Sequence, residues 1–233
     1  MERDPAPAQI PLELPVEPRF GREHFLAAES NAAALGMIER WPDWPDRVLL
    51  LVGPPGSGKS HLAAIWAERS RALRVDPRRP PALGALVAAA PGAIVIDDVD
   101  RVTDETALFH LMNFAVEHQV FVLMSARRAP AADQVKLPDL LSRLRRAPMV
   151  EIGAPDDALL RAVLEKLFRD RQLNVDAPAL DYAALRLDRS LEAVQAYAAA
   201  LDRTALALQR PITRALAAEV MERFAAGIPE GEE

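Results

Sequence analysis

The sequence predicts an α/β protein in which a parallel sheet with helices on both faces precedes a small all-helical region. Apolar segments of strand length recur between residues 48 and 152, and segments with helical periodicity separate them, which predicts the parallel sheet. After residue 153 only helical periodicity remains. The expected organisation is a tail over residues 1–19, an α/β domain over 20–153, a helical domain over 154–227 and an acidic end over 228–233.

Each α/β element has its own signal. Uninterrupted apolar runs predict buried strands, periodic amphipathic stretches predict the helices between them, and prolines at 77, 80 and 81 predict an irregular connection. In chain order we expect helix 32–40, strand 48–52, helix 61–69, strand 93–98, helix 104–117, strand 120–125, helix 137–146 and strand 149–152. The helical domain is expected to contain helices 157–172, 178–187, 190–208 and 212–224, with a proline turn before the last.

Composition narrows the class of protein. The chain has 233 residues, 50% of them hydrophobic, which supplies a core for one large domain or for one medium and one small domain. It has no cysteine, which excludes disulfides, thiolate metal sites and a cysteine nucleophile. A net charge of −6 and only 5% aromatic residues argue against a face for duplex DNA and against a base-stacking platform. Without a transmembrane-length stretch or a signal-peptide pattern, a soluble cytoplasmic protein is expected.

A glycine-rich loop after the first strand carries the strongest functional signal. Residues 53–60 match the pattern G-x-x-x-x-G-K-S of a phosphate-binding P-loop, between the strand and the helix that this motif requires. Gly56 and Gly58 let backbone N–H groups turn toward a phosphate, and the helix N-terminus adds partial positive charge. Lys59 can reach the β- and γ-phosphates, and Ser60 can ligate Mg²⁺. The predicted residues for ATP or ADP are Gly53, Pro54, Pro55, Gly56, Ser57, Gly58, Lys59, Ser60 and His61.

The alternative to the P-loop interpretation is a Gly/Pro turn that precedes a helix by chance and has no function. The downstream segment of residues 93–98 favours the functional interpretation because it ends in two carboxylates. Asp97 lies where ligands bind in open parallel sheets and can hold the Mg²⁺ shell together with Ser60. Asp98 can orient the attacking water, which makes it the predicted catalytic carboxylate. The alternative is a pair of acids that cap the strand or the next helix.

Two further residues are predicted to contact the nucleotide. Ser125 ends the neighbouring strand, and its hydroxyl can sense the γ-phosphate; an ordinary strand-end serine is an equal alternative. Arg189 lies near the start of a helix in the helical domain, where an arginine can fold over the phosphates.

A basic cluster of Arg143, Arg145 and Arg146 precedes the last predicted strand. An arginine at a domain surface can enter a neighbour's nucleotide site and offset transition-state charge, an effect of ~10³–10⁵ in rate in other systems. By chemistry alone, a solvated basic face is the stronger alternative.

The proline-rich tail contains an alternating apolar segment over residues 9–14, with Gln9 followed by Ile10, Leu12 and Leu14. This segment cannot form a core of its own, so its apolar side chains suggest docking into a partner's pocket. On these residues alone, a disordered low-complexity tail is the safer interpretation.

Together these segments resemble the AAA+ domain of the bacterial DnaA-like family, and more closely the Hda regulators that inactivate DnaA. The resemblance runs from about Phe20 to the last helix and rests on residues 25–31, the P-loop, Ile96-Asp97-Asp98 and the stretch Leu137-Pro138-Asp139-Leu140-Leu141-Ser142-Arg143-Leu144. It implies a three-layer αβα AAA+ domain with a helical lid, Arg143 as the arginine finger, and residues 9–14 as a Q-x-x-L-x-L motif for the polymerase III sliding clamp.

The chain also departs from this family. Where DnaA has Ser-Asp after its sensing strand, this chain has Ser125-Ala126. The lid arginine can be matched in two registers, one using Arg189 and the other placing Glu192 at that position. A helix-turn-helix domain like the one that DnaA uses on duplex DNA does not follow the lid, so sequence-specific duplex binding is not expected.

The leading hypothesis is a nucleotide-bound AAA+ regulator of replication initiation that docks on the sliding clamp and stimulates hydrolysis of DnaA-bound ATP, with weak ATPase activity of its own at most. The runner-up is a helicase-loader-type or motor ATPase acting on nucleic acid, and the third is a nucleotide-binding scaffold without a catalytic contribution. The sequence leaves open whether the protein is a monomer or a homo-oligomer (a dimer or a filament), and whether ATP or ADP is its working ligand.

Overall fold

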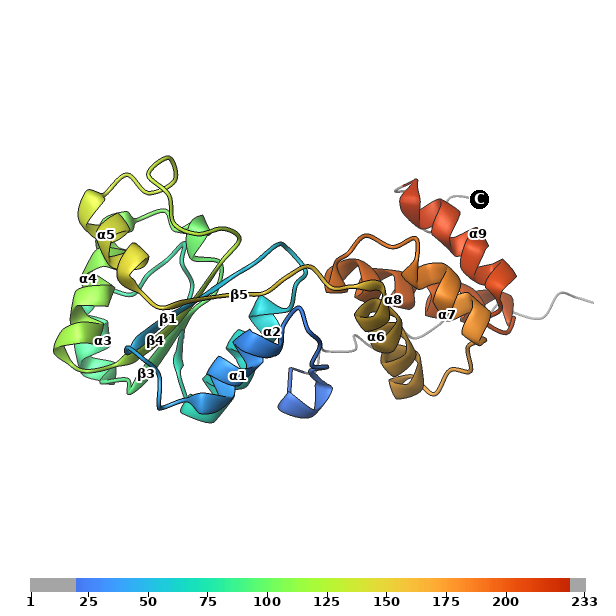
Figure 1. Ribbon diagram of the computed structural model, residues 1–233, viewed down its shortest axis with the longest axis horizontal. Helices are drawn as coiled ribbons and strands as arrows, with labels where there is room; N and C mark the ends of the chain where they lie inside the picture. Colours follow the sequence, from blue (N-terminus) through green and yellow to red (C-terminus); the bar gives the residue numbers. More distant parts are fainter. Residues whose placement is uncertain (1–19, 227–233) are drawn as a thin grey trace, which may run out of the picture. The chain divides into compact units, whose positions relative to one another are not determined.

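The computed structural model describes residues 20–226 (Figure 1). The predicted clamp motif at Gln9, Ile10, Leu12 and Leu14, and the acidic end, lie outside the described residues. The described chain divides into two compact units. Residues 20–160 with 188–193 form the sheet unit, and residues 161–187 with 194–226 form the helical unit. Residues 154–160 and 188–193, which lie beyond the expected boundary at residue 153, therefore group with the sheet.

The sheet has five parallel strands in the order β2-β3-β4-β1-β5. They are β1 (Val48–Val52), β2 (Leu73–Val75), β3 (Ala93–Ile96), β4 (Phe121–Ala126) and β5 (Met149–Glu151). Four of these strands are predicted by the sequence. The fifth, β2, has three residues with an exposed arginine in the middle, which is too short for a strand pattern to emerge. The prediction of a parallel α/β sheet is confirmed.

The register aligns the carboxyl ends of the central strands. Val52 of β1 lies opposite Ala126 of β4, and Ile96 of β3 lies opposite Met124. The loop after β1 is the predicted P-loop, and the two aspartates follow β3. Because parallel strands end at the same edge, the topology brings the P-loop and both carboxylates together.

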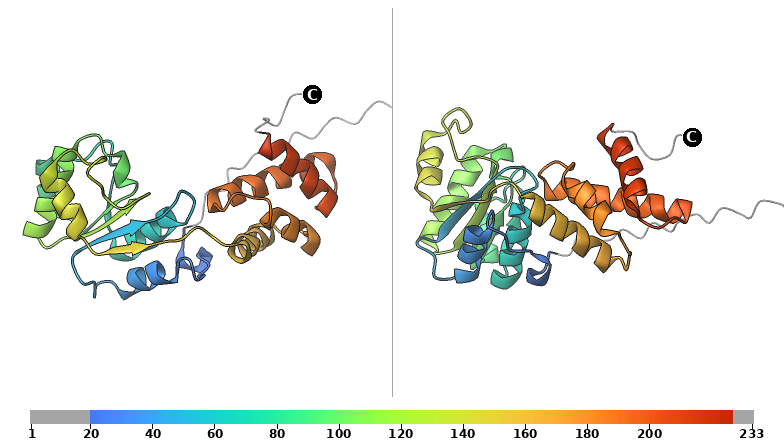
Figure 2. Two further views of the ribbon diagram at one scale, coloured as in Figure 1. Left: turned by 45° about the horizontal axis from the view of Figure 1, so that its top comes forward. Right: turned by 45° about the vertical axis from the view of Figure 1, so that its right-hand side comes forward.

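Helices cover both faces of the sheet. The helices of this unit are α1 (Ala32–Arg40), α2 (Lys59–Ser70), α3 (Leu83–Ala89), α4 (Glu105–Glu117) and α5 (Pro138–Arg146), with short 3₁₀ turns η1 (Arg22–His24) and η2 (Val99–Arg101). In both views of Figure 2, α1 and α2 lie on one face and α3, α4 and α5 on the other. The helix α3 was not predicted, because its uncharged sequence shows no amphipathic pattern.

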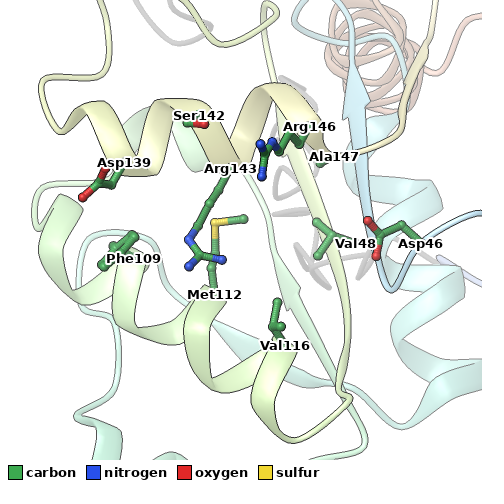
Figure 3. A pocket seen from close by; sticks show the side chains of 10 residues that line it. All are labelled: Asp46, Val48, Phe109, Met112, Val116, Asp139, Ser142, Arg143, Arg146 and Ala147. Carbon is green, nitrogen blue, oxygen red and sulfur yellow. The ribbon is translucent and has the colours of Figure 1, made fainter.

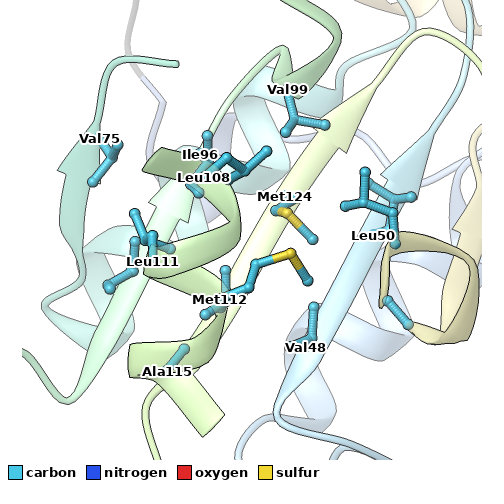
Figure 4. Close-up of a cluster of buried hydrophobic side chains, with 14 of the residues drawn as sticks. Val48, Leu50, Val75, Ile96, Val99, Leu108, Leu111, Met112, Ala115 and Met124 are labelled. Carbon is cyan, nitrogen blue, oxygen red and sulfur yellow. The ribbon is translucent and has the colours of Figure 1, made fainter. Parts of the chain in front are cut away.

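The side chains of β1 show why the strand is apolar throughout. Leu49 and Leu51 pack into the core beneath α1 and α2, whereas Val48, Leu50 and Val52 pack into the core beneath the other three helices. Figure 4 shows Val48 and Leu50 facing Met112 of α4. Successive side chains of a strand point to opposite faces, so a strand covered on both faces must be apolar at every position.

Tryptophans anchor the helix that follows the P-loop. Trp66 of α2 is fully buried and stacks on Trp44, with ring centroids 5.2 Å apart. The indole N–H of Trp44 donates to the carbonyl oxygen of Met37 at 2.7 Å. This packing fixes α2 against α1, and it therefore fixes the direction of the P-loop at the N-terminus of α2.

Four helices make up the rest of the described chain: α6 (Asp157–Asp170), α7 (Ala177–Ala184), α8 (Leu191–Leu208) and α9 (Arg214–Ala225). Each corresponds to a predicted helix, with ends that differ by a few residues. In the helical unit the buried Tyr197 hydroxyl donates to the carbonyl oxygen of Ala217 at 2.7 Å, which ties α8 to α9. Among the described residues, no helix combines the length and the apolar character needed to cross a membrane.

Candidate nucleotide site and arginine surface

The P-loop takes a backbone path that requires glycine. Gly56 and Gly58 have φ values of 68° and 101°, and Gly58 precedes the first residue of α2. A Cβ atom at Gly53 would lie 2.3 Å from the carbonyl oxygen of Ile152. These positions combine left-handed backbone and close backbone approach, which only glycine accommodates without strain.

Lys59 is held inside the loop. Its Nζ atom donates to the carbonyl oxygens of Gly53 and Pro54, both at 2.8 Å, and the residue is only 5% exposed. Burial lowers the pKa of Lys59, and the nearby carboxylates of Asp98 and Asp97 oppose this effect. A buried cation is costly without a counter-charge, so the loop carries a positive charge that a phosphate group would neutralise.

Other atoms of the loop also fit an anionic ligand. The buried hydroxyl of Ser57 has no hydrogen-bond partner among the described residues. Ser60 is exposed in the first turn of α2, where the helix N-terminus attracts negative charge. The described residues contain no group of three or more His, Cys, Asp or Glu side chains that could hold a metal ion. An ion here would therefore take Ser60, Asp97, phosphate oxygens and water, the mixed oxygen shell that Mg²⁺ prefers.

The two aspartates after β3 differ in their contacts. The Ser125 hydroxyl donates to Oδ1 of Asp97, and the backbone N–H of Asp98 donates to the same hydroxyl oxygen at 2.8 Å. Asp98 adopts left-handed backbone with φ 54°, and its Oδ2 lies 3.3 Å from Nη1 of Arg101. Asp98 is thus partly neutralised by its own η2 turn, while the contact from Ser125 fixes Asp97.

A segment preceding α1 packs on the start of α2. The rings of Phe20 and Phe25 meet the His61 ring edge-on, with centroids 5.4 and 5.2 Å away. The buried Asn31 shapes this segment, because its side chain accepts from the Ala28 N–H at 2.9 Å and donates to the Leu26 carbonyl at 3.0 Å. Residues 25–31, part of the segment that carries the family resemblance, thus lie next to the P-loop helix.

Arg127 is a residue of this region that the sequence analysis missed. It directly follows β4, and its Nε lies 3.7 Å from Oδ2 of Asp100. Burial is the main cause of the lowered pKa of Lys59, and the positive charge of Arg127 acts in the same direction. Its charge therefore acts at the phosphate end of the site. Arg127 directly follows a central strand, and this position at the carboxyl edge of the sheet could have identified it from the sequence.

The start of α8 lies against the P-loop. The Leu191 N–H donates to the carbonyl oxygen of Gly56 at 2.7 Å, and a Cβ at Gly56 would lie 1.9 Å from the Ser190 hydroxyl. Arg189 pairs with Asp157 at 3.2 Å, and its side chain is 62% exposed. Glu192 is exposed as well. The role of Arg189 toward a nucleotide stays a prediction.

Arg143 lies in a different environment, a cavity of about 440 Å³ between α4, α5 and the start of β1 (Figure 3). Its guanidinium carbon is 5.1 Å from the ring centroid of Phe109. No described carboxylate lies within ion-pair distance of Arg143. The neighbouring Arg145 and Arg146 are exposed, and Arg145 Nε donates to the carbonyl oxygen of Pro130 at 3.4 Å. The lining residues are Asp46, Val48, Phe109, Met112, Val116, Asp139, Ser142, Arg143, Arg146 and Ala147.

A five-stranded parallel sheet in this order, with a P-loop after β1, acidic residues after β3 and a following helical region, is the architecture of the AAA+ nucleotide-binding proteins. Solved structures bear out this fold. Domain III of the Thermotoga maritima replication initiation protein DnaA superimposes with a TM-score of 0.74 at 17% identity, over 91% of this chain and 99% of that one. AMPPCP-bound DnaA from Aquifex aeolicus gives 0.67 at 16% identity, over 83% and 68%.

The fold is thus DnaA-like, and sequence similarity points the same way. The chain is 23% identical over 256 aligned positions to the chromosomal replication initiator protein DnaA of Cutibacterium acnes, covering 94% of this chain and 48% of that protein. It therefore spans about half the length of that relative. It is also 26% identical over 174 positions to an uncharacterized protein of Haemophilus influenzae, covering 69% and 75%. No protein-family model matches the sequence.

A motor protein shares the fold. The Holliday junction branch migration motor RuvB of Thermotoga maritima superimposes with a TM-score of 0.68 at 18% identity, over 88% of this chain and 72% of that one. At such identities the similarity describes the fold alone. The choice between an initiation regulator and a motor therefore has to come from the residues of the site.

Proposed function

We propose that this protein is a nucleotide-binding AAA+ regulator of replication initiation, of the Hda type. In this proposal it binds ATP or ADP at its own P-loop, docks on the sliding clamp, and stimulates hydrolysis of ATP bound to DnaA by inserting Arg143 as an arginine finger. DnaA and the clamp are its two protein partners.

The observation that carries the proposal is that Arg143 lies at the end of β1 away from the chain's own P-loop. Arg143 shares its cavity with Val48, the first residue of β1, whereas the P-loop follows Val52, the last residue. At the rise of a strand these two residues are about 13 Å apart. Burial is the main cause of the lowered pKa of Lys59, and the charges of Asp97 and Asp98 oppose it. The cation that contributes to this pKa is Arg127 rather than Arg143. This placement supports the proposal that Arg143 serves a site on another molecule.

The chain's own site suits binding more than turnover. Lys59 would contact the β- and γ-phosphates, and Ser60 with Asp97 would hold Mg²⁺, which supplies charge neutralisation between the phosphates. Asp98 is the candidate for orienting water, yet its carboxylate is paired with Arg101 at 3.3 Å. A carboxylate engaged in an ion pair is less free to turn toward an attacking water, which favours a slow ATPase.

The test is single-turnover hydrolysis of ATP preloaded on DnaA, with purified clamp loaded on DNA. The protein should stimulate hydrolysis only when the clamp is present. A chain in which Gln9, Leu12 and Leu14 are all changed to alanine should lose both clamp binding and stimulation, while it keeps its nucleotide affinity and melting temperature. If this variant still co-elutes with the clamp, the clamp-docking part of the proposal is wrong.

A motor ATPase is the competing function, and the similarity in fold to RuvB is the observation that favours it. A motor turns over its own ATP and accelerates on nucleic acid. Steady-state hydrolysis by the protein alone, with and without single-stranded and duplex DNA, separates the two. Strong DNA-stimulated turnover would replace the regulator proposal by the motor.

A further inference from the structure

Ser125 is one of the few polar side chains buried in the sheet. It lies in β4 and is 1% exposed. In the register of β3 and β4, Ile96 is opposite Met124, which places the residues that follow them, Asp97 and Ser125, side by side. The hydroxyl therefore meets the aspartate across two neighbouring strands at the carboxyl edge of the sheet.

The proton of this hydroxyl and one of its lone pairs are engaged within the protein. A serine has one O–H donor and two acceptor lone pairs. The donor goes to Oδ1 of Asp97, and one lone pair accepts the backbone N–H of Asp98 at 2.8 Å. The next residue of β4, Ala126, is 3% exposed and has no polar side chain. The end of β4 thus has no free hydroxyl proton to donate to a phosphate oxygen.

The two bonds act on both aspartates, one on the carboxylate of Asp97 and the other on the backbone of Asp98. The bond to Oδ1 fixes the rotamer of Asp97, which would otherwise be free to turn. The bond from the Asp98 N–H holds the chain in the left-handed conformation, φ 54°, that directs this residue toward Arg101. Non-glycine residues adopt this conformation only where surrounding contacts impose it.

We propose that Ser125 is a positioning residue: it holds the carboxylate of Asp97 and the backbone of Asp98 in place for Mg²⁺, and it does not read the γ-phosphate. This inference rests on the proposed nucleotide site but not on the proposed action on DnaA. Because the metal shell is common to both nucleotides, Ser125 contributes equally to the binding of magnesium-bound ADP and ATP. Any preference for ATP over ADP then depends on groups outside β4.

The experiment is calorimetric titration of the full chain with ADP and with the ATP analogue AMPPCP, each in Mg²⁺ and in EDTA. Ser125→Ala should lower the affinity for both nucleotides about tenfold in Mg²⁺, because a charge-assisted hydrogen bond to Asp97 is lost. In EDTA the variant should match the parent. Ser125→Cys is nearly isosteric but a weak donor, so its affinities should match those of the alanine variant. Ser125→Thr keeps the hydroxyl, so its affinities in Mg²⁺ should match those of the parent. If Ser125→Ala does not fold, the cysteine variant carries the test.

Each other outcome overturns the inference. A loss confined to AMPPCP would make Ser125 a γ-phosphate sensor, and an equal loss in EDTA, with a lowered melting temperature, would make it a packing residue only. Unchanged affinity of Ser125→Ala in all four titrations would mean that the Ser125 hydroxyl is not needed to position Asp97. A parent protein that fails to bind either nucleotide would instead defeat the proposed function, so the two failures are distinguishable.

Discussion

The P-loop and the cavity around Arg143 lie in the same unit and are built in opposite ways. In the P-loop the cation Lys59 is buried and hydrogen-bonded at 2.8 Å to two carbonyl oxygens of its own loop. Around Arg143 the cavity is open, and the guanidinium rests on a phenylalanine ring without an ion pair to a described residue. One cation is enclosed by its own chain, and the other is presented at a surface.

This difference agrees with the role proposed for each cation. A buried, pre-positioned lysine suits tight binding of a ligand inside the chain, since little ordering remains to be done when the phosphate arrives. An arginine held only by an aromatic face can leave it at small cost, because an exposed cation–π contact is worth about 0.5–1 kcal/mol. The first site should therefore control affinity, and the second should control a rate on another molecule.

The largest expected effect is on the partly buried cation of the cavity, Arg143. Arg143→Ala should reduce stimulated hydrolysis of DnaA-bound ATP by about 10³, the lower end of the range for arginine fingers, and leave the protein's own nucleotide affinity unchanged. The measurement is the single-turnover assay with clamp and DNA. Arg145→Ala and Arg146→Ala, in the same helical turn, are the matched controls. Stimulation that survives Arg143→Ala but is lost in one of these would assign the finger to another arginine.

The enclosed cation should show the converse pattern. Lys59→Ala should weaken nucleotide binding about a hundredfold, because the charge facing the β- and γ-phosphates is lost. Equilibrium titration with fluorescent ADP measures this. Lys166→Ala is the control, since that lysine pairs with Asp170 on α6. An affinity close to that of the parent would show that the loop does not bind phosphate through this residue.

The tight path of the P-loop predicts a smaller effect at Gly56. Gly56→Ala should destabilise the protein by about 2 kcal/mol, through left-handed backbone and a clash with Ser190. Denaturant unfolding measures it. Gly36→Ala in α1, where an added Cβ meets no atom within 4 Å, should be neutral or stabilising. Adding Ser190→Gly to Gly56→Ala should recover part of the loss; no recovery would mean that the backbone alone carries the cost.

The smallest expected effect lies in the helical unit. Tyr197→Phe should cost about 1 kcal/mol, because the Ala217 carbonyl loses its donor. Burial raises the pKa of Tyr197. The neutral Tyr197 hydroxyl therefore contributes its full stabilisation at pH values below the unfolded-state pKa of about 10. This contribution is lost as the pH rises above that value, because the unfolded chain then gives up the proton first. Melting curves at neutral and alkaline pH test both points. Tyr182→Phe, the other tyrosine, should change little, and an equal loss there would contradict the assignment.

The P-loop was predictable because its chemistry is local. Its glycines, lysine and serine are consecutive in the chain, and an apolar strand before it and a helix after it complete the pattern. The central strands were predictable for a related reason, since strands buried on both faces are uniformly apolar. The strand β2 was missed because three residues are too few to show an alternating hydrophobic pattern. The helix α3 was missed because its uncharged sequence shows no amphipathic pattern.

By itself, the sequence determined the α/β class, the strand-loop-helix of the P-loop and the aspartates at a strand end, because these depend on neighbours in the chain. The tertiary structure decided which groups meet across long separations. It paired Ser125 with Asp97 through strand register, brought the charge of Arg127 to Lys59, turned Arg189 toward Asp157, and placed Arg143 at the far end of β1 from the P-loop. These contacts depend on the order of strands in the sheet and on helix packing, and neither leaves a local trace in the sequence.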